Sequence, residues 1–99
     1  MIYEVSFTDE AENDLNCVEE YLSQFYPSTA RNFFEKVKKS IDLLSTMPFM
    51  YSEYEEDSYF RKMTVNDYLF FYSVDETNKR IIIHRVFHAK RDVSQQINL

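Results

Sequence analysis

The stretch that decides the fold spans residues 60–87 and reads FRKMTVNDYLFFYSVDETNKRIIIHRVF. It contains three segments rich in the β-branched and aromatic residues that favour strands, at residues 60–65, 68–74 and 80–87. Short polar stretches with the composition of turns separate these segments. The sequence therefore predicts three strands joined as an antiparallel meander. The run Ile81-Ile82-Ile83 is apolar on both faces, which indicates that the last strand lies inside its sheet.

Upstream of this stretch the period of the apolar residues changes. Residues 2–7 alternate as a strand, and Thr8 then fits a helix N-cap with acidic residues behind it. One helical stripe follows, made of Ala11, Leu15, Val18, Leu22 and Phe25. After a break at Pro27, a second helix begins near Ser28 or Thr29 and ends before Pro48; its apolar positions are Ala30, Phe33, Phe34, Val37, Ile41 and Leu44. The short break predicts an antiparallel helix pair.

The predicted order is strand, two helices, then three strands, with residues 49–57 as a loop. This order predicts an α+β fold in which residues 1–99 form a single domain with one sheet. Strict alternation in the last strand would place Ile82, His84 and Val86 on one face and Ile83, Arg85 and Phe87 on the other. The polar end, from residue 92 to residue 99, is expected to be a short helix or a tail.

Composition narrows the possible functions. The chain has 99 residues and a net charge of −6, but residues 1–57 hold 13 acidic and 4 basic residues, whereas residues 58–99 hold 4 and 7. This asymmetry indicates either a basic working surface or simply an acidic helical face beside a mixed sheet. Overall acidity argues against tight nonspecific binding to nucleic acid. The absence of glycine excludes phosphate-binding loops and dinucleotide fingerprints, so no cofactor is expected.

Metal and membrane sites are not expected either. One cysteine and two histidines give no zinc set of usual spacing, and Cys17 is interpreted as a half-buried structural thiol. No stretch reaches the roughly 20 apolar residues of a membrane span, and the N-terminus shows no secretory signal. We therefore expect a cytoplasmic protein.

Chemistry-bearing residues gather where the last strand ends. His88 closes the strand and is followed by Lys90 and Arg91, so it can act as an acid or a base beside two cations. The alternative is that Arg91 and Asp92 only tie down the chain end through an ion pair. His84, inside the strand, is interpreted as a hydrogen-bonded structural histidine.

A second basic group opens the first strand of the meander. Arg61 and Lys62 stand beside Tyr59 and Phe60, an arrangement that suits RNA binding through phosphate contacts and base stacking. They can equally protect an exposed sheet edge against aggregation. The aromatic residues of the next strand are interpreted as core: Tyr68, Phe70, Phe71 and Tyr72.

Five short motifs, in order, resemble the RelE/ParE toxin family over nearly the whole chain. They are Ala11-x-x-Asp14-Leu15, Leu44-x-x-x-Pro48, Phe60-Arg61-Lys62-Met63, Tyr68-Leu69-Phe70-Phe71-Tyr72 and Phe87-His88-Ala89-Lys90-Arg91-Asp92. The resemblance implies the toxin of a type II toxin–antitoxin pair, with plasmid stabilisation and growth inhibition as its roles and a protein antitoxin as its partner.

Two mechanisms are implied by the resemblance. RelE-like members cut messenger RNA on the ribosome without a metal, whereas ParE-like members inhibit DNA gyrase. This chain has Leu69 and Ile97 where the ribonucleases carry an arginine and a tyrosine, so the leading hypothesis is gyrase inhibition by protein–protein binding. The alternatives are a ribonuclease that uses His88 and Arg91 as catalytic residues, and a member that has lost its toxicity. The residues expected to bind the target or RNA are Arg61, Lys62, Arg85 and Lys90.

Overall fold

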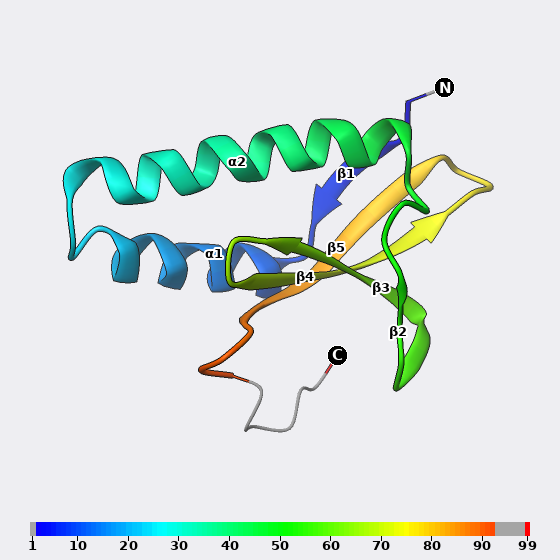
Figure 1. Cartoon of the computed structure of the whole chain (residues 1–99). Coiled ribbons are helices and arrows are strands. Elements are labelled where there is room, and N and C mark those ends of the chain that lie inside the picture. Colours follow the sequence, from blue (N-terminus) through cyan, green and yellow to red (C-terminus); the bar gives the residue numbers. More distant parts are fainter. Residues whose placement is uncertain (1, 93–98) are drawn as a thin grey trace.

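The computed structural model describes residues 2–92 and residue 99, and it places two helices over one face of a five-stranded sheet (Figure 1). In chain order the elements are β1 (Glu4–Phe7), α1 (Asp9–Leu22), α2 (Pro27–Thr46), β2 (Glu53–Tyr54), β3 (Asp57–Val65), β4 (Tyr68–Asp75) and β5 (Arg80–His88). The strands lie in the order β1-β5-β4-β3-β2. The predicted α+β class and the predicted order of elements are therefore confirmed.

The last three strands form the expected antiparallel meander. Strand β3 pairs with β4, and β4 pairs with β5. Strand β1 joins the sheet by parallel pairing with β5, from Glu4 opposite Arg80 to Phe7 opposite Ile83. Strand β5 thus has a neighbour on each side, as predicted, and its Ile81 and Ile83 are fully buried because they belong to the core between the sheet and the helices.

The hydrophobic core lies between the helix pair and one face of the sheet. The helices contribute Ala11 and Val18 from α1 and Phe33, Val37 and Leu44 from α2. The sheet contributes Met63, Val65, Tyr68, Phe70, Tyr72, Ile81, Ile83 and Val86. Tyr72 is fully buried, and its hydroxyl donates a hydrogen bond to the carbonyl of Pro48 at 2.9 Å. The aromatic residues of β4 are therefore core, as predicted.

Asparagine and lysine adopt positive φ in the turns that precede β4 and β5. Asn66, between β3 and β4, has φ of 55°, a left-handed conformation that asparagine tolerates better than most residues. Lys79, before β5, has φ of 54°, and its ammonium lies 5.3 Å from the ring centroid of Tyr3. Asparagine is typical of such turns, whereas lysine is not, so the left-handed conformation of Lys79 could not be predicted from the sequence.

Two predicted boundaries were wrong. Helix α1 ends at Leu22, and after Ser23 the N–H groups of Gln24 and Phe25 bond to carbonyls three residues back and no longer four. Phe25 is therefore not on the buried stripe; it is 56% exposed and packs edge-on against Tyr21. In addition, the predicted loop at residues 49–57 contains β2, which pairs with β3 through Glu53 and Tyr54.

The predicted alternation in β5 was also wrong, because a β-bulge interrupts it. Phe71 pairs with Arg85, and the next residue, Tyr72, pairs with Ile83, so no residue of β4 stands opposite His84 in the register, although Nε2 of His84 is hydrogen-bonded to Oγ of Ser73 at 2.8 Å. The extra residue restores the core side at Val86, which is buried with Ile83 although three positions separate them. The ring of His84 instead meets Phe60 edge-on, at 5.0 Å between centroids.

Candidate functional site

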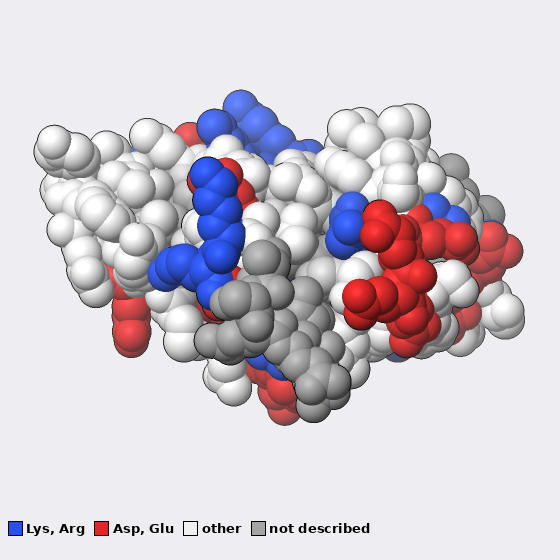
Figure 2. All heavy atoms as spheres, turned by 60° about the horizontal axis from the view of Figure 1, so that its bottom comes forward, with Lys and Arg blue, Asp and Glu red and all other residues white. Residues whose placement is uncertain are grey.

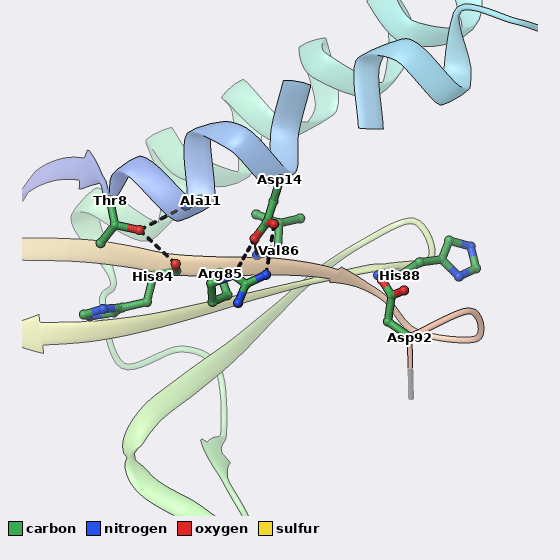
Figure 3. A network of polar contacts seen from close by, with 8 residues as sticks. All are labelled: Thr8, Ala11, Asp14, His84, Arg85, Val86, His88 and Asp92. Atoms are coloured by element: carbon green, nitrogen blue, oxygen red, sulfur yellow. Dashed lines mark hydrogen bonds and ion pairs between the residues drawn. The ribbon is translucent and has the colours of Figure 1, made fainter. Parts of the chain in front are cut away.

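Helix α1 takes over as the neighbour of β5 beyond the end of β1. Thr8 caps α1 by accepting a hydrogen bond from the N–H of Ala11, and its hydroxyl donates to the carbonyl of His84 at 2.8 Å. Six residues further along, the carboxylate of Asp14 accepts the N–H of Val86 at 2.9 Å (Figure 3). Two side chains of α1 thus satisfy backbone groups of β5 that have no strand beside them.

The same Asp14 carboxylate holds Arg85. Its two oxygens accept from Nε and Nη2 of Arg85 at 2.8 and 3.1 Å, a bidentate pair. These hydrogen bonds raise the pKa of Arg85 against the opposing effect of its burial. The guanidinium also lies over the ring of Phe87, 4.6 Å from its centroid. Arg85, predicted as a target- or RNA-binding residue, is therefore engaged in holding α1 to β5.

The segment after β5 closes on itself as a tight turn. Asp92 accepts the N–H of His88 through Oδ2, and its own N–H bonds back to the carbonyl of His88 at 3.0 Å. Inside the turn, Nδ1 of His88 accepts the N–H groups of Lys90 at 3.1 Å and Arg91 at 3.0 Å. The neutral ring therefore carries its proton on Nε2. Figure 3 shows the His88 ring pointing away from the Asp92 carboxylate.

Arg91 leaves this turn to join two tyrosines. Its Nη2 donates to the hydroxyl of Tyr68 at 2.9 Å, and its guanidinium lies 4.0 Å from the ring centroid of Tyr21 in α1. The alternative prediction was an ion pair between Arg91 and Asp92. In the structure the side chain of Arg91 instead bonds to Tyr68, and the carboxylate of Asp92 instead accepts the N–H of His88. Burial raises the pKa of Tyr68, although the positive charge of Arg91 opposes this shift. Tyr68 therefore remains a neutral hydroxyl near pH 7.

A pocket of about 190 Å³ opens beside these side chains, and a second of about 270 Å³ lies on the other side of Tyr68. Both are lined by Tyr21, Tyr68 and His88, and the first also by Arg91 and Asp92. We call this group the strand-end cluster: Tyr21, Tyr68, His88, Arg91 and Asp92. It joins the C-terminal part of α1 to the end of β5.

The other two predicted basic residues lie elsewhere. Arg61 pairs with Tyr72 in the sheet, four residues from Tyr68 and so roughly 13 Å along the strand. Its guanidinium donates to the carbonyl of Tyr51 at 2.7 Å and lies 3.9 Å from Glu53. Lys62 is opposite Phe71, on the face of the sheet away from the helices, and its ammonium lies 5.7 Å from the ring centroid of Tyr54.

The charged side chains on the surface are also spread out, as Arg61 and Lys62 are from the strand-end cluster. On the face shown in Figure 2, the basic side chains lie in several places, some of them directly beside acidic side chains, and they form no continuous positive patch. Among residues 2–92 and 99, no three histidine, cysteine, aspartate or glutamate side chains come together as metal ligands. No helix in that part of the chain is long and apolar enough to span a bilayer. Cys17 is exposed, not half-buried as predicted, and lines the smaller pocket.

Sequence reasoning missed two members of this region. Tyr21 was assigned no role, because nothing in the sequence shows that Arg91, 70 positions later, lies over its ring. Asp14 belongs to a motif recognised in the sequence, but its contact with Arg85 joins residues 71 positions apart. One signal for Asp14 was available in the sequence. Its position falls on the buried side of the helix, whereas the other acidic residues of this helix lie on the exposed side.

The match to known families decides the identity. Residues 5–93 match the family described as ParE toxin of type II toxin-antitoxin system, parDE. The chain belongs to this family. It is therefore a toxin of a type II toxin–antitoxin system within the RelE/ParE group, and the predicted family is confirmed. A comparison with curated protein sequences gives no match.

Solved structures of the same group share the fold of this toxin. The chromosomal ParDE system from P. aeruginosa matches with a TM-score of 0.73 at 16% identity, over 90% of this chain and 98% of that chain. The RelBE2 toxin-antitoxin complex from Mycobacterium tuberculosis matches with a TM-score of 0.65 at 23% identity, over 89% and 99%. A mutant of E. coli toxin RelE in the free state matches with a TM-score of 0.66 at 15% identity, over 93% and 88%.

Proposed function

We propose that this ParE-family toxin acts by binding a protein target, DNA gyrase, and not by cutting messenger RNA. The observation that carries the proposal is the hydrogen bonding of His88, whose Nδ1 accepts two backbone N–H groups. A neutral imidazole has a single basic nitrogen, and a general base must offer it to the substrate hydroxyl. In this turn that nitrogen already accepts the N–H groups of Lys90 and Arg91.

The positions of the basic residues support the same proposal. Metal-free cleavage of RNA needs preorganised cations around the reacting phosphate. Here Arg61 is held by Tyr51 and Glu53, and Arg85 is held by Asp14. Lys62 points to the other face of the sheet from His88, and Leu69 offers no charge. Ile97, the other departure from the ribonuclease pattern, lies outside the described residues.

A surface suited to protein binding remains at the strand-end cluster. Lys90 and Arg91 are both exposed, and Arg91 is stacked on Tyr21, which is itself 37% exposed. Tyrosine and arginine are enriched among the residues that contribute most to the binding free energy of protein interfaces. We therefore assign Lys90 and Arg91 to target binding, with Tyr21 as the aromatic member of that surface.

Inhibition of purified gyrase tests this assignment. Wild-type toxin should block ATP-dependent supercoiling at micromolar concentration or below. Lys90→Glu should weaken inhibition by roughly tenfold, because it places a like or unpaired charge in the interface. Lys39→Glu, the same reversal at an exposed position of α2, should leave inhibition unchanged. Absence of inhibition by a micromolar excess of the wild-type toxin would contradict the gyrase proposal.

The second candidate is a ribosome-dependent, metal-independent endoribonuclease. One observation favours it, because His88, Arg91 and Tyr68 line a single pocket of about 190 Å³. Toeprinting on translating ribosomes separates the two candidates. The gyrase proposal predicts no new messenger ends, whereas the ribonuclease predicts ends that disappear in His88→Ala. Growth arrest on induction, measured alongside, distinguishes either toxin from a member that has lost its toxicity.

We also propose that a cognate antitoxin protein neutralises this chain. Family membership and the solved complexes of related toxins with antitoxins support this partner. Co-expression with the reading frame that adjoins the toxin gene should yield a stable complex and restore growth. A neighbouring product that neither binds the toxin nor relieves its toxicity would contradict this pairing.

A further inference from the structure

The short turn between α1 and α2 gathers three large rings at the surface. Tyr21, Phe25 and Tyr26 are 37%, 56% and 74% exposed. None of the three belongs to the hydrophobic core between the helices and the sheet, so packing within this chain does not account for them. Single exposed apolar side chains are common on proteins, whereas a group of exposed rings is typical of a surface that binds a partner. Phe25, which has no polar group, is the member of this group that gains most from such burial.

The turn holds Phe25 in one place. Its N–H donates to the carbonyl of Leu22 at 3.3 Å. The next residue, Tyr26, is the N-cap of α2, and its N–H donates to the hydroxyl of Thr29 at 3.3 Å. The ring of Phe25 packs edge-on against Tyr21, at 5.3 Å between centroids. Because backbone and ring are both ordered before a partner arrives, little conformational entropy is lost when the ring is buried in an interface.

Tyr21 connects this turn to the strand-end cluster. Its ring contacts Phe25 and also lies 4.0 Å from the guanidinium of Arg91. Lys90, the preceding residue, is exposed beside it. The α1–α2 turn and the turn that follows β5 lie toward the same end of the molecule (Figure 1). The exposed rings and the two cations are therefore continuous, and we call Tyr21, Phe25, Lys90 and Arg91 the turn surface.

The two cations of the turn surface have no carboxylate partner in the described part of the chain. None of the ion pairs found among residues 2–92 and 99 involves Lys90 or Arg91. The acidic residue next to them, Asp92, uses its carboxylate to accept the N–H of His88. A partner that brings aspartate or glutamate to this place would supply the missing opposite charge.

The neighbouring charges favour a protein partner over RNA, although rings and cations can bind either. Glu19 and Glu20 are exposed in the last turn of α1, the turn that also carries Tyr21. RNA brings a phosphate with every nucleotide, so it could not cover the turn surface without meeting these two carboxylates. A protein can place acidic side chains over Lys90 and Arg91 alone and apolar side chains elsewhere.

We infer that Phe25 anchors the toxin to its protein target, and that it enters an apolar hollow bordered by aspartate or glutamate on that target. The inference rests on the protein target of the proposed function and adds a binding residue and the chemistry of the surface that it meets. The ring of Phe25 fills the hollow, and the bordering carboxylates pair with Lys90 and Arg91. A few buried aromatic and arginine side chains commonly supply most of the binding free energy of a protein interface.

The Kd of full-length toxin for purified, intact gyrase tests this inference. Phe25→Ser should raise the Kd by roughly tenfold or more, because truncating an aromatic anchor removes a large part of the buried apolar area. Phe25→Leu keeps an apolar side chain and should stay within about threefold of wild type. Phe49→Ser is the matched control. It makes the same change at a ring that is 46% exposed beyond the other end of α2, and it should leave the Kd unchanged.

Two further readouts accompany these measurements. The melting temperature of Phe25→Ser should equal that of wild type, which shows that weaker binding does not come from unfolding. Added salt should weaken the binding of wild-type toxin, because it screens the pairs that Lys90 and Arg91 form with carboxylates. A Kd that does not change with salt would overturn the acidic border.

The outcomes separate the anchor from the target. If Phe25→Ser binds gyrase as tightly as wild type while Lys90→Glu binds more weakly, the anchor is overturned and the gyrase proposal stands. If wild-type toxin does not bind gyrase, both are overturned. A Kd for Phe25→Leu as high as that of Phe25→Ser would mean that the flat ring itself is required, as in stacking on a base, and would overturn the apolar hollow.

Discussion

Replacing Asp14 with alanine removes the acceptor of three hydrogen bonds that join α1 to β5. The N–H of Val86, a residue only 4% exposed, loses its partner, and an unsatisfied buried donor costs about 1–3 kcal/mol. The pair with Arg85 adds about 0.5–1 kcal/mol, because the two side chains are 27% and 18% exposed and water screens them. The expected loss in the free energy of unfolding is therefore about 1.5–4 kcal/mol.

Urea unfolding followed by circular dichroism measures this loss. A domain of this size should also melt about 10–20 °C lower. Asp14→Asn keeps one oxygen for Val86 but loses the charge and replaces the second acceptor of Arg85 with an amide N–H₂, so it should recover about half of the stability. Glu12→Ala, an exposed position on the same helix, is the matched control and should change stability by less than about 0.5 kcal/mol. If Asp14→Ala were no less stable than Glu12→Ala, the assigned role of Asp14 would be refuted.

Three further predictions concern the surroundings of β5. Burial lowers the pKa of His84, so the neutral form of its ring is favoured in the folded state. The contribution of His84 to stability should be full above pH 6.5 and should be lost as the pH falls through the lowered pKa. Denaturant midpoints measured across pH should show a weaker dependence in His84→Gln. Tyr72→Phe leaves the Pro48 carbonyl without its buried donor and should cost about 1–2 kcal/mol in the same urea assay, whereas Tyr59→Phe, at an exposed ring, should be neutral. Thr8→Val removes both the cap of α1 and the hydrogen bond to the His84 carbonyl, so it should lower the free energy of unfolding by about 1–2 kcal/mol. Ser6→Val is the control. An equal loss of stability in Ser6→Val would contradict the capping role of Thr8.

Local patterns in the sequence were sufficient for most of the fold. Alternation and helical spacing depend on neighbours a few positions apart, and they predicted β1, both helices and the meander. The bulge at His84 escaped prediction because it depends on how β4 and β5 align, and an insertion of one residue leaves no composition signal. The short strand β2 was missed for a similar reason, since only its contact with β3 makes it a strand.

The candidate site was predicted less well than the fold. The sequence placed His88 and Arg91 at the end of a strand, and the structure puts both in one cluster. It did not predict that Nδ1 of His88 would bond inside its own turn, or that Arg91 would reach Tyr68 and Tyr21. These contacts depend on side-chain directions and on residues far apart in the chain. Arg61 and Arg85 were predicted to bind the target or RNA, but both side chains bond to other residues of the chain. Those partners, too, could not be predicted from local patterns.

The role proposed for His88 is to shape a binding surface without any transfer of protons. Its most direct test is supercoiling inhibition by wild-type toxin and His88→Asn side by side. The asparagine oxygen can accept the N–H groups of Lys90 and Arg91 as Nδ1 does, but it cannot act as a base. We expect equal inhibition of gyrase by both proteins and intact messenger RNA on translating ribosomes with each. Messenger cleavage by wild-type toxin that is lost in His88→Asn would contradict it.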